Sequence, residues 1–201
     1  YGGSVQIDYL ETYPYLKTFY KGYGFEKQYD RARGHIYALE DVINTKRPKA
    51  GASCLACKVS IFNKEFVEDP SVAAMDFDEY VASHDIVGDT PGVVQVNRQH
   101  LSDVLENNPE KEYLDGRMLA CAQCHVEYYM TNDEKIVTLP WSEGLGAKEA
   151  YDYYQKIDFY DWEHELTGAK VLKAQHPETE TFMGSVHQMA GADCITCHMP
   201  Q

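Results

Sequence analysis

Every cysteine of this chain belongs to a Cys-x-x-Cys pair, and this feature constrains the fold more than any other. Three pairs account for all six cysteines: Cys54/Cys57, Cys121/Cys124 and Cys194/Cys197. The second and third pairs are followed directly by His125 and His198, whereas the first is followed by Lys58. Cys-x-x-Cys-His is the attachment sequence of c-type haem, in which the thiols bond to the porphyrin and the histidine binds the iron.

Three other interpretations of these pairs fit less well. Structural zinc sites use Cys-x-x-Cys pairs two at a time, so three pairs would leave one unused. A disulfide across so short a ring would be strained, and a thioredoxin-like motif would not occur three times. The sequence therefore predicts three covalently bound haem c groups. One alternative stays open for the first pair, in which the haem has been lost and Lys58 is a solvated lysine.

Length and composition agree with a chain built around cofactors. We expect one domain, residues 1–201, in which three haems leave 201/3 = 67 residues each. Each porphyrin would supply apolar bulk that a small core must otherwise provide. We therefore expect a mainly α fold with much irregular chain wrapped around haems. The spacing of apolar residues predicts helices over residues 98–105 and 147–157, with Tyr151 and Tyr154 on one face of the second. The tyrosine-rich first fifty residues predict irregular chain packed on a flat surface.

The charge and the N-terminal sequence limit the partners and the compartment. A net charge of −14 argues against nucleic acid, whose phosphates would be repelled. It suits docking to a basic electron-transfer partner, and simple solubility explains it equally well. No apolar run is long enough to cross a bilayer, and the first ten residues are not a secretory signal. Because haem is attached to such motifs outside the cytoplasm, we expect a periplasmic or otherwise extracytoplasmic protein whose signal peptide has been removed.

Because Lys58 stands where the other motifs have histidine, the first haem is a candidate catalytic centre rather than only an electron carrier. An amine binds iron only when deprotonated, so its pKa, ordinarily about 10.4, must be brought down by burial and by the metal. A relay haem has both axial positions filled by protein, and histidine suffices there. An iron that does chemistry keeps one position open for substrate. The lysine in place of histidine therefore predicts a reactive haem at the first motif.

Five segments of the sequence resemble the ammonia-forming pentahaem cytochrome c nitrite reductases. The segments are RGHIYALEDVINTKR (33–47), CLACK (54–58), CAQCHVEYY (121–129), KAQHPETET (173–181) and VHQMAGADCITCHMP (186–200). They keep the family's order across nearly the whole chain. The resemblance implies a multihaem cytochrome c fold in which nitrite is reduced to ammonia at the Lys58 haem.

By the same resemblance, Arg47, Tyr128 and His176 would line the open face of this haem. Arg47 would anchor the anion with a permanent charge, His176 would donate a hydrogen bond or proton, and the Tyr128 hydroxyl would donate to bound intermediates. The residues alone leave plainer interpretations open. Arg47 lies in a basic turn, Tyr128 could pack against porphyrin, and His176 could be a surface or axial histidine.

The resemblance also implies further metal ligands. Calcium, which prefers oxygen ligands, would be held by four residues. They are Glu127 and Gln175 through their side chains and Tyr128 and Lys173 through their backbone carbonyls. His125 and His198 would be the proximal haem ligands, and His35 the distal ligand of the Cys121/Cys124 haem. His187 matches a ligand of a haem whose motif is absent here. It could be orphaned, could cap the Cys194/Cys197 haem, or could serve a haem in a neighbouring chain.

The departures from the family pattern define two hypotheses. Relatives carry a further attachment motif where this chain has only YVASHDIVGD (80–89), and they continue beyond the end of this sequence. His84, His100 and His164 have no expected ligand role. The favoured hypothesis is a compact nitrite reductase, acting on nitrite or on a related nitrogen oxide or hydroxylamine, that takes electrons from a redox partner. The alternative is a non-catalytic electron-transfer module, completed by another haem-bearing chain or by copies of itself.

Overall fold

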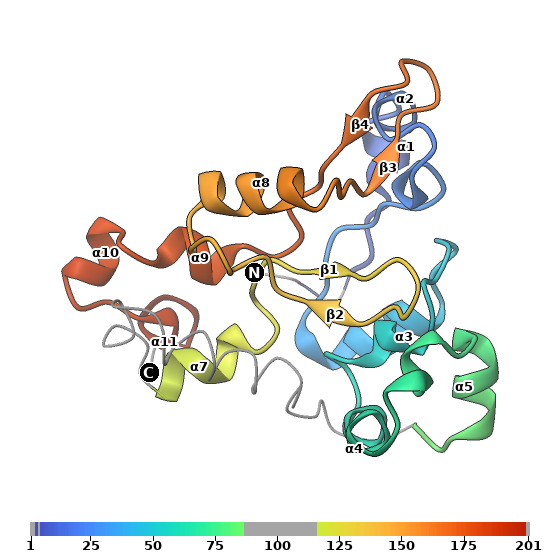
Figure 1. The fold of residues 1–201 in the computed structure, drawn as a ribbon, viewed down its shortest axis with the longest axis horizontal. Coiled ribbons are helices and arrows are strands. Elements are labelled where there is room, and N and C mark those ends of the chain that lie inside the picture. Colours follow the sequence, from blue (N-terminus) through green and yellow to red (C-terminus); the bar gives the residue numbers. More distant parts are fainter. Residues whose placement is uncertain (1–2, 4, 87–115, 200–201) are drawn as a thin grey trace.

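The computed structural model describes residues 3, 5–86 and 116–199, so the helix expected at 98–105 and His100 lie outside the described residues. Within those ranges the longest helix, α8 (Ala147–Lys156), has ten residues. The two hairpins pair β1 (Tyr129–Met130) with β2 (Val137–Thr138) and β3 (Trp162–Glu163) with β4 (Lys170–Val171), each antiparallel. The expectation of a mainly α fold with much irregular chain is confirmed (Figure 1). None of the helices in the described part is long and apolar enough to cross a membrane.

The first thirty residues form a cluster of aromatic rings held by short helices. These are α1 (Tyr9–Thr12), α2 (Leu16–Phe19) and the 3-10 helix η1 (Gly24–Glu26). The Phe25 ring stacks on Tyr29 at 4.4 Å between centroids, and Tyr23 stacks on Trp162 of β3, also at 4.4 Å. The tyrosines therefore pack largely on one another and on β3. The segment is also less irregular than its sequence predicted.

A compact core surrounds the first Cys-x-x-Cys pair. Its chain runs through η2 (His35–Tyr37), α3 (Ala38–Ile43), η3 (Ala52–Leu55), α4 (Ser60–Glu68), η4 (Pro70–Ala74) and α5 (Phe77–Ser83). Leu55, Val59 and Phe62 are almost completely buried there. Gly51 has φ +152°, and a Cβ at this position would lie 2.7 Å from the carbonyl oxygen of Ala73. Only glycine therefore lets η3, which carries Cys54, approach η4 this closely.

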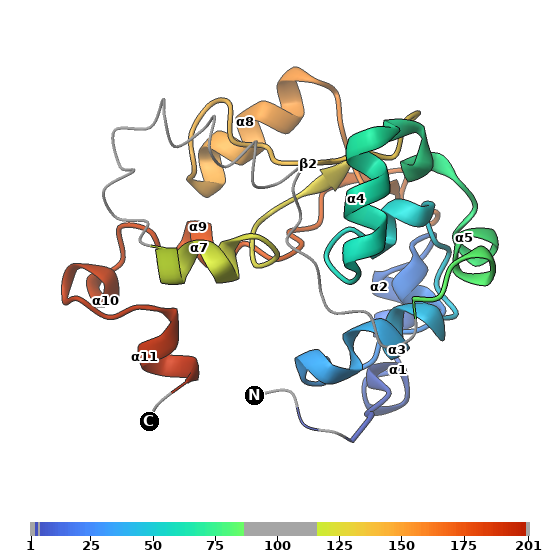
Figure 2. The ribbon, with the colours of Figure 1, turned by 90° about the horizontal axis from the view of Figure 1, so that it is seen from below.

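The second half of the chain forms a less enclosed arrangement. It comprises α7 (Gly116–Ala122), the two hairpins, α8, α9 (Glu178–Phe182), α10 (Val186–Met189) and α11 (Cys194–His198). Figures 1 and 2 both place α10 at the edge of the molecule opposite α3–α5, with α11 beside α7. The helix predicted over 147–157 is confirmed as α8. Of the two tyrosines expected on its inner face, Tyr154 is buried but Tyr151 is 55% exposed, because this short helix packs along a narrow stripe.

Candidate haem and active site

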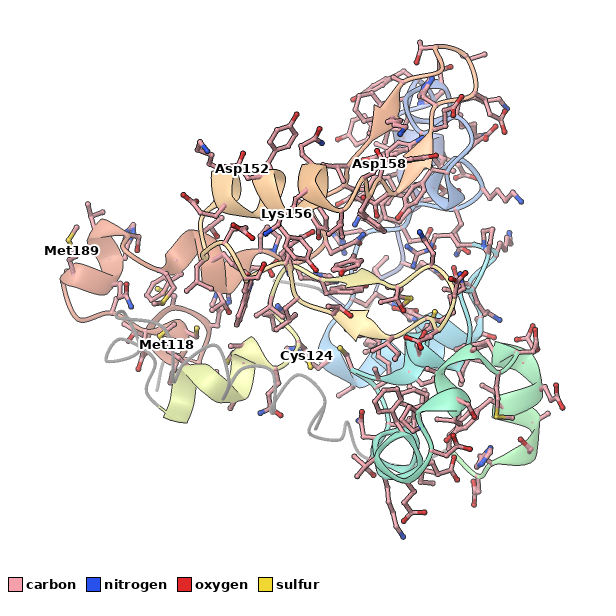
Figure 3. All side chains as sticks on the ribbon, in the orientation of Figure 1. Met118, Cys124, Asp152, Lys156, Asp158 and Met189 are labelled. Atoms are coloured by element: carbon pink, nitrogen blue, oxygen red, sulfur yellow. The ribbon has the colours of Figure 1, made fainter. Side chains whose placement is uncertain are left out.

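The three Cys-x-x-Cys pairs come together although they are far apart in the sequence. All six cysteines are free of disulfides. The Cys57 and Cys124 side chains pack against the same core, and α11, which begins at Cys194, contacts α7, which contains Cys121. Figure 3 shows Cys124 near the middle of the molecule. The second pair therefore lies between the first and the third, so haems attached to the pairs would be neighbours.

Where the first two pairs meet, a hydrogen-bonding interaction between the Cys57 and Cys124 thiols shifts the pKa of each. It raises the pKa of the Cys57 thiol, an effect that burial reinforces, and it lowers the pKa of the Cys124 thiol to about 7. The charge of Lys58 acts on both thiols and lowers the pKa of each. Lys58 therefore lies close to the contact between these two pairs.

His35 and His125 face each other in the way that two ligands of one metal require. Their Nε2 atoms are 3.5 Å apart and their rings are nearly perpendicular, with an interplanar angle of 81°. A metal–imidazole bond is about 2 Å long, so an ion between two nitrogens needs a separation of about 4 Å. The observed separation is somewhat shorter than this, so a small outward movement of the rings would be needed to admit a haem iron between them, and the assignment of both as axial ligands stays a prediction.

Tyr128 and His176 meet beside the first pair. Their rings stack with centroids 6.1 Å apart and planes inclined by 16°. Burial, together with the neighbouring Cys57 and Cys54, raises the pKa of Tyr128, which therefore stays protonated at neutral pH. Partial desolvation of the His176 ring lowers its pKa, and the positive charge of Lys58 acts in the same direction. Tyr128 and His176, two of the three residues expected to line the first haem, thus lie together near its predicted attachment site.

The Arg47 side chain makes its contacts in the N-terminal aromatic cluster. It is exposed, donates from Nε to the Thr45 hydroxyl at 3.2 Å, and places its guanidinium 5.0 Å from the centre of the Phe25 ring. Its charge acts on Tyr23 and Lys173, lowering the pKa of each. The structure therefore associates Arg47 with the N-terminal aromatic cluster rather than with the Tyr128–His176 stack.

The four expected calcium ligands lie together, and the structure adds Asp161 and Tyr154 to them. Glu127 is 5% exposed and accepts from the Tyr154 hydroxyl at 3.0 Å and from the Gln175 backbone N–H at 2.5 Å. Asp161 accepts from the Lys173 backbone N–H at 2.6 Å and from the Gln175 side chain at 3.1 Å. Sequence reasoning missed Asp161, whose only signal was a carboxylate among aromatic residues in FYDWE.

The charge and burial of Glu127 and Asp161 bear on whether this site can bind a cation. Burial raises the pKa of Glu127 and of Asp161, and the charge of Asp161 raises that of Glu127 further. The Lys173 ammonium donates to the Gln175 side-chain oxygen, and its charge acts on both acids. Over the described ranges, no group of three or more His, Cys, Asp or Glu side chains could hold a metal ion. Calcium here would therefore also need amide and backbone oxygens.

The third pair lies on the most open part of the described chain. Asp193 and Thr196 form a capping box that starts α11, and Ser185 caps α10. The side chains of His187 and His198 are exposed. Gly191, with φ +82°, turns the chain between the two helices. The three possibilities for His187 stay open.

The histidines without an expected ligand role have ordinary structural contacts where the structure describes them. His84 Nε2 lies 3.1 Å from Glu65, and its ring stacks on Tyr80. His164 Nε2 lies 3.0 Å from the carbonyl oxygen of Thr18. His84 lies in the segment 80–89, where the resemblance led us to expect an additional attachment motif. Here Tyr80 and Ile86, both fully buried, tie that segment to the core.

The known proteins that resemble this chain in sequence and in fold belong to one family. The family model described as cytochrome c552 matches residues 1–201. Cytochrome c-552 of Desulfotalea psychrophila is 35% identical over 96% of this chain and 44% of its own length, and that of Porphyromonas gingivalis is 32% identical over 100% and 45%. A cytochrome c nitrite reductase catalytic subunit from Desulfovibrio desulfuricans, described with two calcium sites, matches with a TM-score of 0.74 and 28% identity. That match covers 94% of this chain and 48% of the other.

The chain thus spans less than half the length of the curated relatives named above. The family model nevertheless matches the whole chain, and the structural match covers 94% of it. The resemblance inferred from the five segments is confirmed, and so is the multihaem cytochrome c fold. The chain therefore belongs to the cytochrome c552 family and carries covalently bound haem c.

Proposed function

We propose that this chain binds three haem c groups and reduces nitrite to ammonia at the haem attached to Cys54 and Cys57, with Lys58 as an iron ligand. The observation that supports this most strongly is the Tyr128–His176 stack beside the first pair. Two hydrogen-bonding groups next to an atypical ligand suit a site for a small polar substrate. A relay haem needs no such groups.

The chain's own residues would bind and protonate the substrate. The haem, when bound, supplies electrons and a coordination position for a small anion. Tyr128 donates a hydrogen bond, because its raised pKa keeps the hydroxyl protonated. His176, with its lowered pKa, is mostly neutral near pH 7 and becomes a stronger acid once it is protonated. Arg47 contributes a permanent positive charge on the side of Tyr23 and Lys173.

Calcium would stabilise this same site. We propose that Glu127 and Gln175 bind it through side chains and Tyr128 and Lys173 through backbone carbonyls, with Asp161 adding negative charge. A divalent cation would relieve the repulsion between the two buried carboxylates. Dialysis against a calcium chelator should lower the melting temperature and the nitrite turnover together, and added Ca²⁺ should restore both. An unchanged melting temperature would contradict the calcium proposal.

The proposed partners follow from the charge and the substrate. A soluble, basic redox protein would supply electrons to a chain whose net charge is −14. We place the protein in the periplasm or another extracytoplasmic compartment, where haem c is attached. A neighbouring haem-bearing chain or a second copy could contact the exposed α10–α11 region.

The decisive experiment is spectroscopic and kinetic. The isolated protein should show one high-spin haem beside low-spin ones and an intact mass with three haems. It should consume nitrite and release ammonium with a reduced viologen as donor, and nitrite should perturb only the high-spin signal. A wholly low-spin spectrum, unchanged by nitrite or cyanide, would overturn the proposal.

One observation favours the alternative of a non-catalytic electron-transfer module. The Arg47 side chain is exposed and contacts Thr45 and Phe25, rather than donating a hydrogen bond to Tyr128 or His176 in the described part of the chain. A vestigial site would tolerate that position. Nitrite turnover in the Arg47→Lys and Arg47→Gln variants separates the hypotheses, because only a working site should lose activity with both.

A further inference from the structure

The two ring nitrogens of His125 have different partners. Nε2 faces Nε2 of His35 at 3.5 Å, the side on which the iron would lie. Nδ1, on the other side of the ring, lies 3.6 Å from Oε2 of Glu178. One nitrogen is therefore available to the metal while the other faces a carboxylate. In many histidine ligands the second nitrogen donates a hydrogen bond to a carboxylate, which orients the ring and raises its basicity; here the carboxylate is 3.6 Å away and acts through its charge.

Helix α9 fixes Glu178 relative to His125. The next residue, Thr179, is buried and donates to the His125 carbonyl oxygen from both its backbone N–H (3.2 Å) and its hydroxyl (2.6 Å). Glu180 accepts from the backbone N–H of Glu127 at 2.9 Å and from the Trp141 indole at 2.7 Å. Two successive residues of α9 therefore clamp the backbone on either side of Val126. Glu178 is thus held in place by the helix that carries it.

We propose that Glu178 is a positioning residue for the second haem, which acts through His125 to orient the imidazole and to lower the reduction potential of the Cys121/Cys124 haem. The inference rests on the haem ligation proposed above. At 3.6 Å from Nδ1 the carboxylate acts as a nearby negative charge, which stabilises the more positively charged, oxidised iron. Both side chains are partly exposed, so solvent weakens the effect without removing it.

A lower potential at this position would have a consequence for electron flow. The second pair lies between the first and the third, so its haem is the relay through which electrons would reach the Lys58 haem. A relay haem of lower potential gives the transfer to the reactive haem a larger driving force. Glu178 also acts on His176, since its charge raises that ring's pKa against desolvation. The test must therefore read the potential separately from turnover.

The experiment is a redox titration of the three-haem protein and of Glu178→Gln, followed by optical and electron paramagnetic resonance spectra without nitrite. Glutamine keeps the shape of the side chain and removes its charge. One low-spin component should shift to a more positive potential, by an amount that corresponds to roughly a tenfold change in its equilibrium constant, or about 59 mV for one electron. The other components should stay in place.

Two further variants make the result unambiguous. Glu134→Gln removes an equal charge from the exposed turn between β1 and β2 and should shift no component comparably. Glu178→Asp keeps the charge and should retain most of the wild-type potential. It also provides a test of the proposal if Glu178→Gln does not take up all of its haem. The proposal is wrong if fully haem-loaded Glu178→Gln has the same reduction potentials as Glu134→Gln. It is also wrong if the potential shifts as far in Glu178→Asp as in Glu178→Gln. Because no nitrite is present, this outcome is independent of whether the protein is a reductase.

Discussion

The first and third Cys-x-x-Cys pairs lie in very different surroundings. Cys54 and Cys57 are on or next to η3, within a core where Leu55, Val59 and Phe62 are buried. Cys197 is exposed on α11, and Met189 and Met199 nearby are 73% and 67% exposed. Figures 1 and 2 show α10 and α11 toward one edge of the molecule and α4 and α5, which belong to the core around the first pair, toward the other.

The contrast suggests that the two regions have different functions, catalysis in the first and electron relay in the third. A site that must hold substrate within fractions of an ångström needs rigid support, which a packed core provides. A relay haem needs only to stay near its neighbour, so its surroundings can depend on the porphyrin or on another polypeptide surface. The predictions below test whether rigidity and chemistry both belong to the first region.

The largest expected effect is on catalysis. His176→Gln should lower nitrite turnover by about 10²–10⁴-fold, because a positioned proton donor typically contributes that much. Steady-state turnover with a reduced viologen donor measures it. The matched control is His164→Gln, which alters a histidine bound to the Thr18 carbonyl and should leave turnover nearly unchanged. Equal losses in both variants would show that the effect is not specific to the site.

The next effect concerns packing. Phe62→Ala should destabilise the protein by about 3–5 kcal/mol, because it removes a ring that is 2% exposed and leaves a cavity. Met189→Ala, at a position 73% exposed, should change stability by less than about 0.5 kcal/mol. Chemical denaturation of the haem-loaded variants compares the two. A similar loss in both would mean that α10 is covered in solution.

Glycine substitutions sharpen the same comparison at smaller magnitude. Gly191→Ala should cost about 1–2 kcal/mol for its left-handed backbone alone, because nothing lies within 4 Å of the added methyl group. Gly51→Ala should cost more, since its backbone region is almost exclusive to glycine and the methyl group would overlap the Ala73 carbonyl. Melting temperatures of the two variants test the order. The reverse order would contradict the tight contact between η3 and η4.

The last expected effect is a pH dependence of stability. Burial raises the pKa of Glu180 to about 7, so the folded state binds a proton that the unfolded chain releases at a lower pH. This carboxyl therefore destabilises the protein progressively as pH rises from its unfolded pKa, about 4.3, through about 7. Glu180→Gln should be more stable than wild type at pH 8 and nearly equal at pH 5. Urea midpoints at both values test this, with Glu134→Gln as the exposed control.

The attachment chemistry and much of the site could be predicted from local sequence. Haem attachment depends on residues adjacent in the chain, so Cys121, Cys124 and His125 identify it directly. The strings CHVEYY and KAQHPETET led to Tyr128 and His176, which the structure brings into contact. Helix α8 followed from periodicity. Asp161 and Glu178 were missed, because nothing in the local sequence distinguishes them from the other acidic residues of an acidic chain.

The amino-acid sequence by itself determined the type of cofactor and the family, and it predicts the points of covalent attachment, because these depend on residue types at fixed short spacings. Only the tertiary structure decided which pair neighbours which, that Arg47 rests on Phe25, and that Glu178 faces Nδ1 of His125. Those relations join residues tens of positions apart. They are set by how η3, α7 and α9 pack, and packing is a property of the whole chain rather than of any segment.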